Sequence, residues 1–240
     1  MGAPVLSIVI PTLNEAMLID GTLEALHREV AGGDVGSMPE IIVSDGGSTD
    51  GTRERVARHA GVKLLVGPAG RARQLVRGAE QAAGALLLFL HADTRLPVGA
   101  LGRLETLAAR ARTGSWLYGG FPHRYWRGGL GIRLAARVHS LRSRLTGTYY
   151  GDQAPFLSRT LYDRLGGFSD LPAMEDVDLG RRARRLVAPL RMPAPVLNSP
   201  RKLERRGVFR CAVDAVVLLA WLRLGRRAAI ARHPYFAPIR

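Results

Sequence analysis

The sequence is poor in cysteine, the residue that cross-links small folds through disulfides or zinc. Cys211 is the only cysteine among 240 residues, which excludes an intrachain disulfide and a cysteine-rich zinc site. A single cysteine also fits a reducing compartment. Residues 1–10 lack a charged start followed by a long apolar stretch, so we expect no signal peptide and a cytoplasmic protein.

Lysine is almost missing, yet the chain is strongly basic. Lys63 and Lys202 are the only lysines, while Lys and Arg total 35 against 20 Asp and Glu, a net charge of +15. Such a charge favours anionic partners: nucleotide phosphates, nucleic acid or an acidic membrane. No zinc-finger spacing or aromatic-interleaved basic repeat is present, so we expect no nucleic acid. A solvated arginine-rich surface is the alternative explanation.

No apolar run in the C-terminal third is long enough to cross a membrane. Residues 211–222 form a run of 12 that includes Asp214, whereas a span needs about 20 apolar residues. Two interpretations stay open: a buried core helix, or a helix in peripheral contact with an anionic membrane. In the second, the flanking arginines hold the helix at the surface: Arg205, Arg206, Arg223, Arg226 and Arg227.

The first half of the chain alternates strand and helix patterns. Short apolar runs at 6–10, 41–44, 62–66 and 86–91 predict buried strands, and 15–29, 51–60 and 71–83 predict helices. This alternation predicts an α/β fold, a mostly parallel sheet flanked by helices. Ligands of such sheets bind at the carboxyl ends of the strands. The polar residues expected there are Thr12, Asn14, Glu15, Asp45, His91 and Asp93.

The second half is less regular. It predicts helices at 97–112, 175–186 and 205–224, strands at 116–121 and 154–158, and a basic stretch at 124–145. Neither a repeat nor a linker divides it from the first half. We therefore expect a single domain over 1–240.

The turn at 44–51, Ser-Asp-Gly-Gly-Ser-Thr-Asp-Gly, is suited to hold a nucleoside. Its first carboxylate, Asp45, can accept hydrogen bonds from a base or ribose, and the glycines let a ligand approach the backbone. A tight turn with Thr49 or Asp50 as an ordinary helix cap is the alternative. The turn lacks the G-x-G-x-x-G pattern of dinucleotide-binding dehydrogenases.

Five segments in this order resemble family 2 glycosyltransferases of the GT-A fold: SIVIPTLNE at 7–15, IIVSDGGSTDG at 41–51, LLFLHADT at 87–94, GGF at 166–168 and EDVDL at 175–179. The resemblance implies inverting transfer of a sugar from a nucleotide diphosphate-sugar to a hydroxyl acceptor. It also implies a nucleotide-binding half at 1–95 and an acceptor-binding half at 96–200, followed here by a basic helical segment at 201–240. The Q-x-x-R-W motif of processive members is missing.

The resemblance implies a divalent metal, Mg²⁺ or Mn²⁺, at the segment that corresponds to the family's D-x-D. Here the segment reads His91-Ala92-Asp93, so Asp93 is the expected metal ligand, and His91 contacts either the donor or the metal. The expected donor-binding residues are Pro11, Thr12, Asn14, Glu15, Asp45, Gly46, Arg71, Gln74, His91, Ala92, Asp93 and Arg201. Arg71 equally suits a solvated helix face.

The acidic pair Glu175-Asp176 matches the acceptor-side acids of the family. The resemblance implies that Asp176 is the general base and that Glu175 orients the acceptor or the base. Without the resemblance, acids in the first turn of a helix would be interpreted as groups that stabilise the helix dipole, and this is the role expected for Asp178. Asp152 and Gln153 are expected to line the acceptor pocket, with a plain turn as the alternative.

Two other functions compete with glycosyl transfer. A sugar nucleotidyltransferase would carry a Gly-rich signature with Arg and Lys after the first strand, which residues 11–15 lack. A basic module that binds anionic lipid or nucleic acid explains the charge, but it gives Asp45, Asp93 and Asp176 no role.

Overall fold

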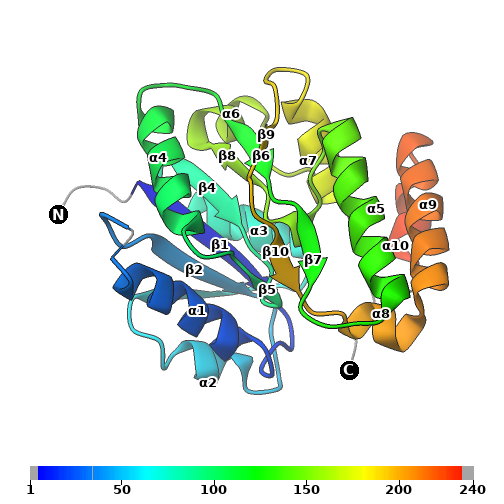
Figure 1. Cartoon of the computed structure of the whole chain (residues 1–240), viewed down its shortest axis with the longest axis horizontal. Helices are drawn as coiled ribbons and strands as arrows, with labels where there is room; N and C mark the ends of the chain where they lie inside the picture. The colour runs from blue at the N-terminus through cyan, green and yellow to red at the C-terminus, as the bar shows by residue number, and fades with distance from the viewer. Residues whose placement is uncertain (1–4, 34, 234–240) are drawn as a thin grey trace.

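The four apolar runs of the first half form neighbouring parallel strands in the computed structural model, which describes residues 5–33 and 35–233 (Figure 1). The strands are β1 (Leu6–Thr12), β2 (Glu40–Asp45), β3 (Val62–Val66) and β4 (Leu86–Phe89). Strand β1 lies between β2 and β4, and β3 pairs with the far side of β2. The predicted parallel sheet is therefore confirmed.

Strands from the second half extend the same sheet. Its full order is β3-β2-β1-β4-β8-β6-β9, where β8 (Phe156–Ser158) runs antiparallel to β4 and β6 (Tyr118–Gly120). A small second sheet joins β5 (Thr94–Arg95), β10 (Val196–Asn198) and β7 (His123–Tyr125). Strand β10 thereby brings residue 198 beside residue 94, next to the end of β4.

Helices cover both faces of the large sheet. On β1, Ile8 and Ile10 pack into one core with α1 (Ile19–Ala31) and α4 (Ala100–Arg112). Val9 points to the opposite face, into a core with α3 (Arg71–Glu80), α6 (Arg159–Arg164) and α7 (Glu175–Ala183). This alternation follows from the two-residue period of a strand. The remaining elements are α2 (Thr52–Val56), η1 (Gly151–Gln153) and β9 (Leu190–Arg191).

The basic stretch at 124–145, for which the sequence predicts no element, forms most of the long helix α5 (Leu130–Thr146). Its exposed apolar side chains recur every three or four residues and so lie on one side of the helix. They are Leu130, Leu134, Val138, Leu141 and Leu145.

The predicted C-terminal helix is divided into α8 (Arg201–Arg206), α9 (Val208–Arg223) and α10 (Arg227–Ala231). The break between the first two lies at Gly207, whose φ of 83° belongs to the left-handed region that favours glycine. Residues 234–240 of the predicted segment lie outside the described residues.

The core-helix interpretation of 211–222 is wrong. Of the residues of α9 only Cys211 and Leu218 are buried, while Phe209 and Val216 are 84% and 68% exposed. One side of α9 packs on Met174 and Val177 near the start of α7, and the other side faces outward. In Figure 1, α9 lies beside α5. Within the described part of the chain, no helix is both long and apolar enough to cross a membrane.

Candidate active site

The turn after β2 is organised around Asp45, which is fully buried. Its Oδ1 accepts from the backbone N–H groups of Gly47 and Ser48 at 2.9 and 2.8 Å. Its Oδ2 accepts from the hydroxyls of Thr12 and Ser48 at 2.9 and 2.5 Å. Both carboxylate oxygens are therefore engaged within the protein. Asp45 and Thr12 thus shape the turn, and a contact of Asp45 with the base or ribose stays a prediction.

Three other residues expected at the donor are also turned inward. The buried amide of Gln74 donates to the backbone oxygens of Thr12 and Ser44 at 2.6 and 3.0 Å and so joins the ends of β1 and β2. A Cβ at Gly46 would lie 3.0 Å from Oε1 of Gln74. Ala92 is part of the apolar core. The buried side chains of Gln74 and Ala92 offer a ligand no surface, so these two residues support the site from beneath.

Two carboxylates and a guanidinium meet above the ends of β1 and β4. Nη2 of Arg201, at the start of α8, lies 2.6 and 2.7 Å from the two carboxylate oxygens of Glu15 and 3.9 Å from Oδ2 of Asp93. Burial raises the pKa of Glu15, and the arginine opposes this effect. The sequence predicts all three as donor-binding residues, and the fold brings them together although Glu15 and Arg201 are 186 positions apart.

Asn14 and Pro11 border this group. Asn14 adopts a left-handed backbone conformation with φ 57°, and its Oδ1 accepts from the N–H of Thr49 at 2.9 Å. Its own N–H donates to the Ser48 hydroxyl at 2.8 Å. Pro11 is half-buried and pairs with Ser44 in the sheet. Asn14 therefore fixes the loop after β1 against the turn after β2.

Arg71 at the start of α3 holds Glu175 at the start of α7. Its Nε and Nη2 donate to the two carboxylate oxygens of Glu175, the second at 3.2 Å, and Nη2 lies 3.7 Å from Oδ2 of Asp176. Burial alone would lower the pKa of Arg71, but the two carboxylates raise it. Burial raises the pKa of Glu175, and Arg71 offsets that effect. Arg71 therefore joins two helix starts, whereas we expected it at the donor phosphates or on a solvated face.

Asp176 is almost buried, and both of its oxygens accept backbone hydrogen bonds. The N–H of Gly151 donates to Oδ2 at 2.5 Å, and that of Val177 donates to Oδ1 at 2.7 Å. His91, which follows β4, packs against the same glycine, since a Cβ at Gly151 would be 2.4 Å from Nε2 of His91 and 3.2 Å from Oδ2 of Asp176. Burial lowers the pKa of His91, and the charge of Arg71 lowers it further, while the nearby carboxylates oppose both effects.

Gln153 does not line an acceptor pocket, because it is fully buried. Its amide nitrogen donates to the Phe121 oxygen and the Ser143 hydroxyl, and its oxygen accepts from Arg142. These contacts hold η1 against α5 and leave no group for a ligand.

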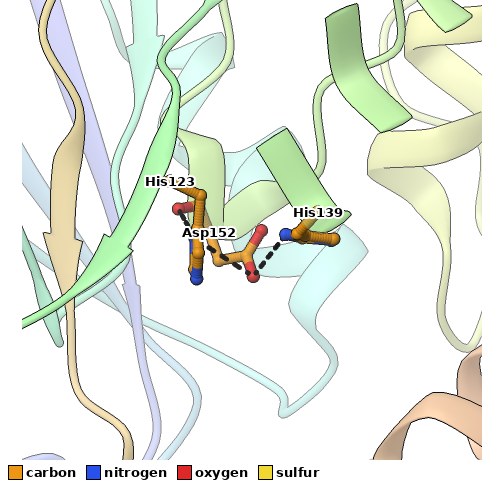
Figure 2. A group of neighbouring side chains, drawn as sticks. All are labelled: His123, His139 and Asp152. Atoms are coloured by element: carbon orange, nitrogen blue, oxygen red, sulfur yellow. Dashed lines mark hydrogen bonds and ion pairs between the residues drawn. The ribbon is translucent and has the colours of Figure 1, made fainter. Parts of the chain in front are cut away.

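Asp152, by contrast, is half-buried and faces two histidines that the sequence analysis missed, His123 and His139 (Figure 2). Burial lowers the pKa of His139 to about 4 even though Asp152 opposes this effect. Burial alone would raise the pKa of Asp152, but the two histidines lower it. No spacing signal could have identified this group, because its members come from β7, α5 and η1.

Comparison with known proteins identifies the family of the chain. Residues 7–155 match the family described as "Glycosyl transferase family 2". A PGL/p-HBAD biosynthesis glycosyltransferase from Mycobacterium tuberculosis is 32% identical over 126 residues, which are 50% of this chain and 47% of the relative. A Mycobacterium bovis protein of the same description matches equally. The chain thus spans about half the length of the curated relatives it matches.

Solved structures share the fold at low sequence identity. A mannosyltransferase from Pyrobaculum calidifontis, in complex with GDP-Man and Mn²⁺, has a TM-score of 0.59 at 21% identity, over 89% of this chain and 65% of that one. A glucosyl-3-phosphoglycerate synthase from Mycobacterium tuberculosis, with Mn²⁺, UDP-glucose and phosphoglyceric acid, has a TM-score of 0.61 at 20% identity, over 93% and 80%. At such identities the likeness concerns the fold, which is GT-A.

Proposed function

Because the chain belongs to glycosyl transferase family 2, we propose that it transfers a sugar from a nucleotide diphosphate-sugar to a hydroxyl group of an acceptor. One observation supports this most directly. The segment 91–93 touches two groups of charged residues: Asp93 lies beside Arg201 and Glu15, and His91 lies beside Gly151 and Asp176. A donor site and a base site next to each other are what transfer between two substrates requires.

The donor would bind above the ends of β1 and β4, within the half formed by residues 1–95. Arg201 supplies a guanidinium suited to a diphosphate, because its planar fork donates to two oxygens at once. Asn14 and Pro11 would border the nucleoside. The known complexes of the structural neighbours with GDP-Man and UDP-glucose support this class of donor.

A divalent metal fits the same place. Both carboxylate oxygens of Glu15 accept from Arg201, whereas Asp93 lies 3.9 Å from the same guanidinium. The Asp93 carboxylate is therefore the hard oxygen ligand that would suit Mg²⁺ or Mn²⁺. Asp93, with 23% of its side chain exposed, would hold the ion together with donor phosphates. The metal would neutralise charge on the departing diphosphate, and Arg201 adds a fixed positive charge beside it. The Mn²⁺ in the two neighbours supports this assignment.

Asp176 would act as the general base of an inverting reaction. As the acceptor oxygen attacks the anomeric carbon, its proton passes to a carboxylate oxygen of Asp176. The new C–O bond forms on the face opposite the leaving diphosphate, and the bond from the anomeric carbon to the phosphate oxygen breaks. The N–H groups of Gly151 and Val177 hold the carboxylate in place, and the Arg71–Glu175 pair fixes the helix start beside it.

The acceptor half would be formed by residues 96–200, with Asp152 close to the base. Residues 201–240 would add a basic segment, and the positions of α5 and α9 support peripheral contact with an anionic membrane. Both α5 and α9 expose apolar stripes, represented by Leu134 and Val216, and both helices carry exposed arginines such as Arg137 and Arg210. Apolar insertion combined with arginine–phosphate attraction is typical of interfacial helices.

Donor turnover tests the proposed function. The chain is incubated with UDP-, GDP- and dTDP-sugars, simple alcohols or alkyl glycosides as acceptors, and Mn²⁺ or Mg²⁺. Release of a nucleoside diphosphate is then measured together with the glycosylated product. The proposal expects one nucleotide class to be consumed, in an acceptor-dependent manner. If no donor stabilises the fold or is consumed with either metal, the proposal is wrong.

A further inference from the structure

Asn198, the last residue of β10, is buried and has a hydrogen-bond partner for each polar group of its side chain. Its Oδ1 accepts from the Thr94 hydroxyl at 2.6 Å. Its Nδ2 lies 2.9 Å from the backbone oxygen of Asp152 and 3.0 Å from Nδ1 of His123. The amide thus joins three segments of the chain that lie far apart in the sequence: β5, β7 and η1.

The partners fix the orientation of this amide. The backbone oxygen of Asp152 can only accept a hydrogen bond, so the amide nitrogen of Asn198 must face it. The second N–H of the same nitrogen then donates to Nδ1 of His123, whose ring proton lies on Nε2. The side chain therefore uses both of its N–H groups and its oxygen. An aspartate or a leucine at this position would fill a similar space without the two donors.

The Thr94 end of this bridge belongs to the segment that holds the proposed metal ligand. Thr94 follows Asp93 directly and is fully buried. It also pairs with Asn198 between β5 and β10. The backbone N–H of the next residue, Ser199, donates to the backbone oxygen of Asp93 at 3.1 Å. Residues 198 and 199 therefore fix the stretch of backbone that carries the Asp93 carboxylate.

The Asp152 end belongs to the turn that holds the proposed base. Asp152 follows Gly151 in η1, and the N–H of Gly151 donates to Oδ2 of Asp176. The oxygen that Asn198 holds and the N–H that Asp176 accepts from thus lie within the same two residues. In the part of the chain that the structure describes, no hydrogen bond joins these two residues directly to residues 93–94. Asn198 bridges the two segments, with a hydrogen bond to each.

We propose that Asn198 is a positioning residue for the transfer, which holds the Asp93 segment and the turn beside Asp176 at a fixed separation. The inference rests on the proposed function, because it takes the roles of Asp93 and Asp176 from there. Donor and acceptor must meet with their reacting atoms roughly 3–3.5 Å apart, and a misplacement of about 1 Å can cost about 100-fold in rate. A buried amide that contacts both segments limits such movement, because breaking its hydrogen bonds leaves buried polar atoms unpaired.

The test breaks the bridge at each end and measures both catalysis and the motion of the turn. Asn198→Leu fills a similar space without hydrogen bonds, and Thr94→Val replaces the hydroxyl by a methyl group. Each should lower kcat by about 10–100-fold, while the donor dissociation constant stays near wild type, because the side chains of Arg201 and Asp93 are unchanged. In Asn198→Leu without any donor, hydrogen exchange of the Gly151 N–H should become about tenfold faster.

Two control variants separate positioning from stability. Thr94→Ser keeps the hydroxyl and should retain most of the wild-type kcat. Ser7→Ala removes a buried hydroxyl near the start of β1, which donates to Glu40 and accepts from the N–H of Gly84. It should lower the melting temperature, as the bridge variants do, but leave kcat unchanged.

Three results with an active wild type would overturn the proposal: a near-normal kcat in folded Asn198→Leu and Thr94→Val, an equal loss in Thr94→Ser, or an equal loss in Ser7→Ala. A wild-type chain that consumes no donor refutes the proposed function instead. Exchange of the Gly151 N–H then decides the inference, since faster exchange in Asn198→Leu supports the bridge and unchanged exchange refutes it. If Asn198→Leu does not fold, the comparison of Thr94→Val with Thr94→Ser decides the question, by kcat and by exchange of the same N–H.

Discussion

The backbone N–H of Gly151 donates a hydrogen bond to Oδ2 of Asp176 across 2.5 Å. This contact joins the turn η1 to the first turn of α7. His91 also packs closely against Gly151, because a Cβ on this glycine would lie 2.4 Å from Nε2 of His91. The position of the carboxylate therefore depends on a residue without a side chain.

Gly151→Ala should displace this turn. The added methyl group meets the His91 ring and Asp176, so we expect a loss of about 1–3 kcal/mol in unfolding free energy. A base displaced by about 1 Å can cost about 100-fold in rate, and donor turnover should fall to that extent. Gly131→Ala is the control, because a methyl group there meets nothing closer than 3.9 Å. Wild-type turnover by a folded Gly151→Ala chain would argue against the packing described.

Asp93→Ala should remove most metal-dependent nucleotide binding while the fold survives. A nucleotide at 100 times its dissociation constant stabilises a protein by about 2.7 kcal/mol, and thermal shift with Mn²⁺ should detect this effect in the wild type only. Asp163→Ala, a change at an exposed acid paired with Arg159, should behave as the wild type. Equal binding in EDTA and in Mn²⁺, for wild type and Asp93→Ala alike, would refute the metal assignment.

Membrane contact should depend on the apolar stripes of α5 and α9. The chain should sediment with vesicles rich in phosphatidylglycerol at low salt and be released at high salt, because salt screens the arginines. Leu134→Asp combined with Val216→Asp should abolish sedimentation, since both side chains are exposed on these helices. Val98→Asp, at a position 94% exposed before α4, should have no effect. A wild-type chain that stays in the supernatant at low salt would exclude this surface.

Lys202 should make stability depend on alkaline pH. Burial lowers its pKa from the ordinary 10.5 to about 8, and the charge of Arg71 contributes. Between these values the unfolded chain holds more protons than the folded one, so stability rises with pH. Relative to Lys202→Met, the wild type should gain up to about 3 kcal/mol between pH 8 and 10.5, at 1.36 kcal/mol per pH unit. The unfolding free energy of both proteins is measured by urea titration at each pH. If it changes with pH in the same way in the wild type and in Lys202→Met, the lowered pKa of Lys202 is contradicted.

The parallel sheet could be predicted because its strands are short apolar runs followed by polar residues, and this pattern is local. That Glu15, Asp93 and Arg201 lie together could be predicted from the sequence only in part. That Glu15 and Asp93 lie at strand ends is a property of the sheet, whereas the place of Arg201 depends on β10 pairing with β5. The inward orientation of Asp45 and Gln74 has no signal in the sequence, since it depends on which hydrogen bonds the folded turn makes.

The histidine cluster and the helix α5 lay beyond prediction for different reasons. His123, His139 and Asp152 meet only through tertiary packing, at no characteristic spacing. Exposed Leu and Val recur in α5 every three or four residues, a spacing that favours a helix, but the frequent Gly and Arg of 124–145 led to its interpretation as a basic stretch. Only the structure shows that this side faces outward.

Transfer by Asp176→Asn, measured with the donor that the nucleotide panel identifies, tests the central claim most directly. The amide cannot accept the acceptor proton, so the rate should fall by about 10²–10⁴-fold, while donor affinity stays near wild type. Because the amide nitrogen must face one of the two backbone N–H groups that the carboxylate accepts from, the unfolding free energy should also fall, by about 1–3 kcal/mol, in a chain that still folds. Asp178→Asn is the matched control on the same helical turn. Its carboxylate accepts from Ser169 and Arg182, so its loss should cost a few-fold at most. Retention of more than a tenth of wild-type transfer by Asp176→Asn, or greater damage from Asp178→Asn, would contradict the account.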